Sequence, residues 1–184
     1  MDLGTGDGRF VLATAAANPD RLVVGIDPVA GAMADSSRRA ARSHGRASLA
    51  NALFVVASAE AIPPDVHGVA DLVTINLPWG SLLRGALAAD PAAAAGIAAL
   101  ARPGGMVEIL VATDARDRLG ADVDVEARLR GTLAADWRAH GLVLTSAAEA
   151  ASEDLARLRT TWARRLRLGT TVDRRAWRIV LRRE

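Results

Sequence analysis

The 184-residue sequence contains no cysteine, no tyrosine and no lysine. Without cysteine it has no disulfide, no thiolate-bound zinc and no cysteine nucleophile. Without lysine it has no P-loop, because that loop holds phosphate with a lysine. The three histidines, His44, His67 and His140, are scattered, so we expect no metal site. There is no apolar run of about 18 residues and no secretory leader pattern, so we expect a cytoplasmic protein without a membrane span.

Charge is unevenly distributed along the chain. The formal net charge is only +2, yet the pI is near 10.7, because all 23 basic residues are arginine. Residues 1–155 hold 13 arginines and 19 acidic residues, whereas residues 156–184 hold 10 arginines and two acidic residues. A basic segment after an acidic body is typical of contact with phosphates. The alternative interpretation is an arginine-rich face that only meets solvent.

Short β-branched runs alternate with alanine-rich stretches, which indicates βαβ units and a mostly parallel sheet. The sequence opens at Met1, Asp2 and Leu3, where the first strand of such a fold ends, so we expect a truncated first strand. Residues 1–184 are expected to form one α/β domain. The last predicted strand alternates apolar and polar residues, as an antiparallel or edge strand does. The predicted strands are 22–26, 52–56, 72–75, 106–111, 142–144 and 177–181, and the predicted helices are 9–17, 29–42, 86–100, 125–140 and 152–158. The helix 86–100 is expected to be broken around Asp90 and Pro91, because proline disfavours helix at the residue before it.

The strongest local motif is Asp2-Leu3-Gly4-Thr5-Gly6-Asp7-Gly8. Alternate glycines let the backbone pass close to a ligand, and the loop opens a helix whose free N–H groups face that ligand. The dinucleotide fingerprint G-x-G-x-x-G would need glycine where Arg9 stands, whereas the spacing matches the loop that holds S-adenosylmethionine. Asp27 follows Gly4 by 23 residues and ends the second strand, where a carboxylate accepts ribose hydroxyls. The alternatives are a glycine-rich turn without a ligand and a surface aspartate.

Two further strand ends carry candidate residues. Ser58-Ala59-Glu60 ends the third strand, and Asn76-Leu77-Pro78-Trp79 ends the fourth, at the edge where such sheets place their sites. The second run resembles the [DN]-P-P-[YFW] motif of methyltransferases that act on adenine nitrogens. An exposed Trp79 would be a platform on which a base stacks, and a core tryptophan is the alternative. Trp162 lies among arginines, an arrangement that suits one stacked base with phosphates around it; a helix with tryptophan inward and arginine outward is the alternative.

Together these stretches resemble the Kam/Npm-type aminoglycoside-resistance methyltransferases, which methylate N1 of an adenine in the decoding site of 16S ribosomal RNA. The glycine loop is shared by many methyltransferases, whereas residues 78–85 together with Trp-x-Arg-Arg-Leu are much more specific. The sequence departs from the family at Asn76, which is apolar in the family, and in having almost none of the N-terminal strand pair. The matching stretches are residues 2–9, 21–27, 57–60, 78–85 and 162–166.

The resemblance implies a Rossmann-like class I fold with a mostly parallel seven-stranded sheet. It implies a monomer that acts on 16S rRNA in the assembled small ribosomal subunit, with S-adenosylmethionine as cofactor, S-adenosylhomocysteine as product, and no metal. The cofactor-binding residues would be Asp2, Gly4, Thr5, Gly6, Asp7, Asp27, Pro28, Ala59, Glu60, Leu77 and Pro78. The target base would lie around Trp79, Trp162 and Ser81. The RNA contacts would be Arg164, Arg165, Arg167, Arg174 and Arg175.

Two other functions stay open on the sequence alone. One is a methyltransferase for another RNA or for a small molecule, which would share only the cofactor half. The other is a cofactor-binding protein that docks on rRNA with little turnover. The basic C-terminal segment and the two tryptophans argue against a small substrate.

Overall fold

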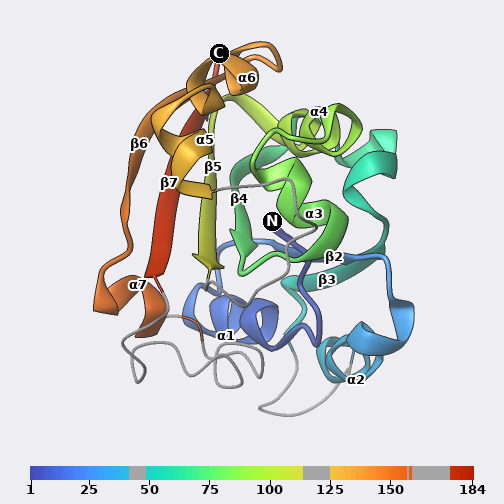
Figure 1. Cartoon of the computed structure of the whole chain (residues 1–184). Helices are drawn as coiled ribbons and strands as arrows, with labels where there is room; N and C mark the ends of the chain where they lie inside the picture. The colour runs from blue at the N-terminus through green and yellow to red at the C-terminus, as the bar shows by residue number, and fades with distance from the viewer. Residues whose placement is uncertain (42–48, 114–124, 157, 159–174) are drawn as a thin grey trace.

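A computed structural model describes residues 1–41, 49–113, 125–156, 158 and 175–184 (Figure 1). The strands are β1 (Asp2–Leu3), β2 (Val23–Asp27), β3 (Ala52–Val56), β4 (Ala70–Asn76), β5 (Ala101–Thr113), β6 (Leu142–Glu149) and β7 (Arg175–Arg183). The α-helices are α1 (Arg9–Ala17), α2 (Ala30–Ala40), α3 (Gly80–Ala86), α4 (Pro91–Leu100), α5 (Val125–Arg130), α6 (Leu133–Arg138) and α7 (Ser152–Ala156). Two 3₁₀ turns, η1 (Ala59–Ala61) and η2 (Pro64–Val66), follow β3.

The strands form one seven-stranded sheet in the order β3-β2-β1-β4-β5-β7-β6. Figure 1 shows β6 and β7 on the left and β2 and β3 on the right. The five strands from β3 to β5 are parallel, whereas β7 is antiparallel to both β5 and β6. The predicted α/β class is confirmed. The last strand is antiparallel, as its alternation indicates, but it lies inside the sheet, and β6 forms that edge.

The first strand is short, and both of its neighbours hold it. Asp2 lies opposite Gly25 of β2 and Thr74 of β4. The Met1 ammonium donates a hydrogen bond of 2.6 Å to the Leu72 carbonyl, so residue 1 continues the pairing with β4. The first strand is two residues long and lies in the middle of the sheet.

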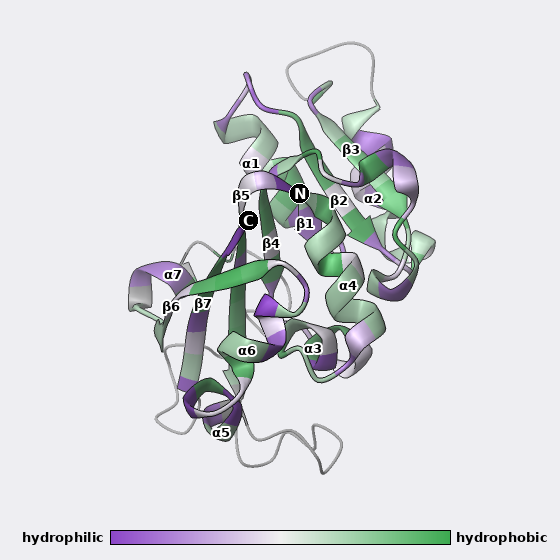
Figure 2. Cartoon of the chain, turned by 90° about the horizontal axis from the view of Figure 1, so that it is seen from above, coloured by the Kyte–Doolittle hydropathy of each residue, from purple (hydrophilic) through white to green (hydrophobic). Residues whose placement is uncertain are grey.

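Helices cover both faces of the sheet, and β2 shows why the sequence places them there. Its side chains alternate: Val23 packs in a cluster with α1 and α2, while Val24 and Ile26 pack in the larger cluster with α3, α4 and α6. Figure 2 shows α1 on one side of the strands and α3 and α4 on the other. At Gly25 the layers come close, since an added Cβ would lie 2.9 Å from Val11. A strand buried on both faces explains the continuous apolar run.

The break expected around Asp90 and Pro91 in the stretch 86–100 is confirmed. The α4 helix begins at Pro91, and Asp90 caps it by accepting hydrogen bonds from the Ala92 and Ala93 amides. The α3 helix, which ends at Ala86, was not predicted. The expected helix 125–140 is broken between α5 and α6 at Gly131, a residue with low helix propensity. Among the described residues no single helix is long and apolar enough to cross a membrane; α3 and α4 meet the length and composition criteria only as a pair, bent by 71°.

Candidate active site

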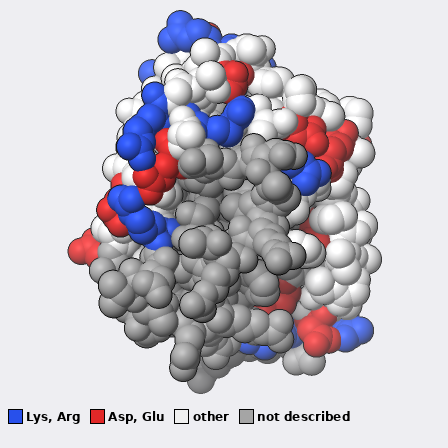
Figure 3. Space-filling model, in the orientation of Figure 1, with Lys and Arg blue, Asp and Glu red and all other residues white. Residues whose placement is uncertain are grey.

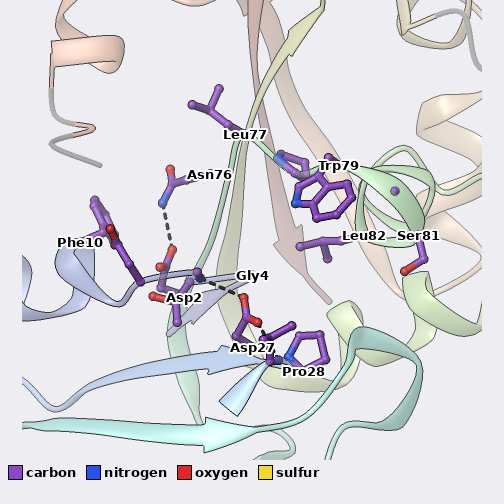
Figure 4. A pocket seen from close by; sticks show the side chains of 16 residues that line it. Asp2, Gly4, Phe10, Asp27, Pro28, Asn76, Leu77, Trp79, Ser81 and Leu82 are labelled. Atoms are coloured by element: carbon purple, nitrogen blue, oxygen red, sulfur yellow. Dashed lines mark hydrogen bonds between the residues drawn. The ribbon is translucent and has the colours of Figure 1, made fainter. Parts of the chain in front are cut away.

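A pocket of about 590 Å³ opens at the carboxyl ends of β1, β2 and β4 (Figure 4). This is the edge at which open α/β sheets bind ligands. The pocket joins three loops that are far apart in the sequence: the glycine loop before α1, the β2–α2 turn and the β4–α3 loop. Its lining residues are Asp2, Gly4, Thr5, Gly6, Asp7, Phe10, Asp27, Pro28, Val29, Asn76, Leu77, Pro78, Trp79, Gly80, Ser81 and Leu82.

The three glycines of the first loop have left-handed backbones, with φ of 76° at Gly4, 57° at Gly6 and 70° at Gly8. Their surroundings differ. An added Cβ would lie 2.4 Å from a Leu82 methyl at Gly4 and 2.5 Å from the Phe54 ring at Gly8, so these two glycines permit close packing. At Gly6 nothing lies within 4 Å, so its bare backbone faces open space on the pocket side of the loop.

Asp27 joins the glycine loop to the β2–α2 turn. Its Oδ2 accepts a hydrogen bond from the Gly6 amide and its Oδ1 accepts one from the Val29 amide, each 2.9 Å long. The residue is 8% exposed and lines the pocket. Because a carboxylate has about four acceptor positions, it retains capacity for hydroxyl donors of a ligand.

Asp2 lies deeper in the pocket and is 3% exposed. Its Oδ1 accepts hydrogen bonds of 2.9 Å from the Thr74 hydroxyl and from the Asn76 amide. Burial raises the pKa of the Asp2 carboxyl, and these hydrogen bonds oppose that shift. The Met1 ammonium acts on this carboxyl electrostatically, and a buried carboxylate here suits a ligand that brings a further positive charge.

The β4–α3 loop presents Trp79. Leu77 has φ of 54°, a left-handed backbone that is rare for such a residue, and its amide donates a 2.8 Å hydrogen bond to the Leu110 carbonyl. Its side chain is buried against Leu110 and Leu158. The reversal at Leu77 lets Pro78 and Trp79 line the pocket, and Trp79 is 75% exposed. A large exposed apolar ring beside a pocket suits stacking.

Of the three other predicted site residues, one lines the pocket and two do not. Ser81 lines the pocket, whereas Ala59 and Glu60 are not among its lining residues. Ala59 is buried in the core, and Glu60 is exposed on η1. Hydrogen bonding to its own backbone amide, and then to Ser58 and Ser81, lowers the pKa of Glu60. Glu60 therefore lies outside the pocket and contacts it only through its hydrogen bond with Ser81, which is a lining residue.

Most of the predicted RNA-contacting segment lies outside the described residues, including Trp162, Arg164, Arg165, Arg167 and Arg174. Arg175 is described. It forms ion pairs with Glu126 and Glu149 and lies over the Trp177 ring at 5.0 Å. On the face in Figure 3 the described basic and acidic side chains are interspersed. Carboxylates already pair with the Arg175 guanidinium. Its contact with RNA stays a prediction.

Five lining residues were missed by the sequence-based site prediction: Phe10, Val29, Asn76, Gly80 and Leu82. Asn76, Gly80 and Leu82 belong to stretches that the motifs had already marked, so only their orientation was unknown. Phe10 and Val29 each lie directly after a pocket loop, Phe10 as the second residue of α1 and Val29 as the residue before α2.

The pocket fits S-adenosylmethionine. The Gly6 backbone is uncovered, and two buried acidic residues, Asp2 and Asp27, line the pocket. These features suit a ligand with ribose hydroxyls and an ammonium group. No group of three or more potential metal-ligating side chains occurs within the described part of the chain.

The sheet order and this glycine loop define the class I methyltransferases that use S-adenosylmethionine. The profile of the family "NpmA: 16S rRNA (adenine(1408)-N(1))-methyltransferase" matches residues 1–180. The chain belongs to this family.

The known proteins similar to it agree. The 16S rRNA (adenine(1408)-N(1))-methyltransferase of Streptoalloteichus tenebrarius is 35% identical over 171 residues, which are 90% of this chain and 79% of the relative. A mutant of the Catenulisporales acidiphilia enzyme, solved with its cosubstrate S-adenosylmethionine, superposes with a TM-score of 0.86 at 31% identity, covering 99% of this chain and 84% of that one. The structure of the aminoglycoside resistance methyltransferase NpmB1 superposes with a TM-score of 0.83 at 38% identity, covering 100% of this chain and 85% of that one. The predicted family is confirmed.

Proposed function

We propose that this chain binds S-adenosylmethionine in the described pocket and methylates N1 of adenine 1408 of 16S rRNA in the assembled small ribosomal subunit, as a monomer in the cytoplasm, and so confers aminoglycoside resistance. The observation that carries the proposal is a single pocket that joins the glycine loop, the Asp27 carboxylate and the exposed Trp79. Cofactor groups and a stacking platform for a base thereby meet at one edge of the sheet.

Each part of the pocket has a distinct role in binding the cofactor. Asp27 accepts the ribose hydroxyls, and the glycine loop lets the backbone approach the ligand. Asp2, which is buried, accepts a hydrogen bond from the ammonium of the methionine part. Such charge-assisted hydrogen bonds are about twice as strong as neutral ones. When bound, S-adenosylmethionine supplies an electrophilic methyl group.

The chain's residues need to position the base rather than deprotonate it. Adenine N1 carries an in-plane lone pair and no proton, so no general base is required. Orientation of two bound reactants accounts for several kcal/mol of a barrier of this kind. Trp79 supports the extruded base from one side, and Trp162, which lies outside the described residues, is proposed to cover the other. Extrusion of a base costs a few kcal/mol, and stacking offsets this.

The proposal is tested by mixing the protein with isolated small subunits, isolated large subunits and tRNA, each with methyl-labelled cofactor. We expect label in small subunits only. Label in tRNA would favour the alternative of another RNA substrate, and cofactor binding without transfer would favour a docking protein with little turnover.

The Asp2 carboxyl is expected to strengthen cofactor binding and to lower the free energy of unfolding of the cofactor-free protein. Burial raises its pKa, so its contribution to folding free energy is full below the unfolded pKa and is lost as pH rises through the folded pKa. We expect Asp2→Asn to raise the Tm of the cofactor-free protein by a few degrees at neutral pH and by less in acid. The same change should weaken binding of S-adenosylhomocysteine about tenfold or more. Calorimetry and thermal melts at several pH values measure both effects, and exposed Asp65→Asn is the control.

The basic segment is expected to act through phosphates. Replacing Arg164, Arg165 and Arg167 with alanine should weaken subunit binding and reduce its salt dependence by about one unit of slope per lost contact. Cofactor affinity should not change. Subunit binding measured across a salt series tests this, with Arg102→Ala as control because Arg102 pairs with Asp71 at the opposite edge of the sheet. Unchanged slopes in the triple variant would return these residues to a solvent-exposed face.

A further inference from the structure

A small apolar cluster includes Leu77, two residues before Trp79, and is separate from the main core of the protein. Its buried members are Leu77 of the β4–α3 loop, Leu110 of β5 and Leu158, which follows α7. Phe10 of α1, which lines the pocket, packs against this cluster as well. The cluster therefore joins two walls of the pocket to the connection between β6 and β7, and the roles above leave it unused.

Leu158 has a fixed place because α7, which precedes it, is tied to the sheet. Arg178 of β7 donates two hydrogen bonds of 2.9 Å to Glu108 of β5, and it forms an ion pair of 3.7 Å with Asp154 of α7. The Leu158 amide in turn donates a 3.1 Å hydrogen bond to the Leu155 carbonyl. Figure 1 shows α7 at the end of the sheet where β5 ends. Two strands thus set the point from which Leu158 enters the cluster.

Leu77 depends on this support because its backbone is left-handed. Its φ of 54° is a conformation that leucine adopts rarely and keeps only where the surroundings impose it. Two contacts impose it here: the 2.8 Å hydrogen bond from the Leu77 amide to the Leu110 carbonyl, and burial of the side chain in the cluster. Phe10, by contrast, lies in an α-helix whose own hydrogen bonds fix its backbone.

We infer that Leu158 is a positioning residue for methyl transfer, which acts through the Leu77 backbone on the place of Trp79; this rests on the proposed function. Without the Leu158 side chain, Leu77 loses packing that opposes its backbone strain. Because Pro78 follows, the conformation to which Leu77 relaxes is extended. That change redirects Pro78 and moves Trp79 relative to the bound cofactor. A displacement of about 1 Å between reacting groups lowers a rate by about 100-fold.

A graded series at Leu158 tests this in single-turnover methylation with saturating small subunits. We expect Leu158→Ala to be about 10- to 100-fold slower than wild type, Leu158→Val to be intermediate, and Leu158→Met, which refills the space, to keep most of the rate. Binding of S-adenosylhomocysteine, measured by calorimetry, should stay within about twofold of wild type and shows that each variant is folded. Leu142→Ala is the matched control, because Leu142 is a buried leucine of the main core, and it should transfer methyl groups at the wild-type rate.

A double-mutant cycle shows whether the effect passes through Trp79. If it does, Leu158→Ala or Leu158→Val changes the residual rate of Trp79→Ala by less than about twofold, because no indole is left to misplace. Equal slowing in the wild-type and Trp79→Ala backgrounds would overturn the inference. A wild-type rate in the Leu158 variants, or a loss of cofactor affinity as large as the loss of rate, would overturn it as well. Wild-type protein that transfers no methyl group would overturn the proposed function and this inference together, whereas any of the other results with active wild type overturns only the inference.

Discussion

Alanine in place of Trp79 is expected to abolish most methyl transfer to small ribosomal subunits while leaving the affinity for S-adenosylhomocysteine nearly unchanged. The indole is 75% exposed, so its loss removes little packing from the core. Each base–aromatic stack contributes about 1–3 kcal/mol, and without it the extruded adenine is not held in place. Single-turnover methylation and calorimetry on the same preparation measure the two quantities. Trp162→Ala is expected to behave in the same way.

Two comparisons separate stacking from a general effect on the fold. Trp79→Phe should retain part of the activity, because a smaller aromatic face still stacks. Leu53→Ala, at an exposed apolar side chain of β3, should retain all of it. Full activity of Trp79→Ala, or a loss of cofactor affinity as large as the loss of activity, would contradict a role in holding the base.

The second large effect is expected at Asp27. Asp27→Ala should weaken binding of S-adenosylhomocysteine by about 1.5–3 kcal/mol, because it removes charge-assisted hydrogen bonds to the ribose. It also frees the Gly6 and Val29 amides, which now donate to this carboxylate, so the glycine loop loses a fixed support. Asp27→Asn keeps the shape of the side chain but has one acceptor oxygen in place of two, and should give an intermediate loss. Isothermal titration measures all three proteins.

Asp35→Ala serves as the control, since Asp35 is an exposed carboxylate of α2 outside this pocket. Its affinity should equal that of the wild type. If Asp27→Ala bound the ligand as tightly as wild type, the ribose would have to lie elsewhere and the assignment of the cofactor pocket would be wrong.

Much of the fold could be predicted because the apolar runs and turn residues of the sequence coincide with the buried strands and the helix starts of the structure. The run Val23–Asp27 is buried on both faces and has no helical alternative, and α1 begins and ends as predicted because the glycine loop precedes it. The helix α3 was missed because the reversal that precedes it depends on the left-handed backbone of Leu77, a residue type that does not mark such a turn. The split between α5 and α6 likewise depends on one glycine in an otherwise helical stretch.

The site was predictable where the chemistry depends on spacing and not where it depends on orientation. The glycine loop and Asp27 could be placed from their distance in sequence, and they meet in the pocket. The partnership of Asp2 with Thr74 and Asn76 could not, because it joins residues more than 70 positions apart through the register of β1 with β4. That register fixes the orientation of the Asn76 carboxamide, because Asp2 accepts a hydrogen bond from its Nδ2.

The most direct test of the central claim is to map the modified base. Small subunits treated with the protein and S-adenosylmethionine are extracted, and the 16S rRNA is analysed by reverse transcription and by mass spectrometry of nucleosides. We expect a single new stop at adenine 1408 and N1-methyladenosine as the only new nucleoside. A stop at another position, or methylation at a different atom of that base, would contradict it.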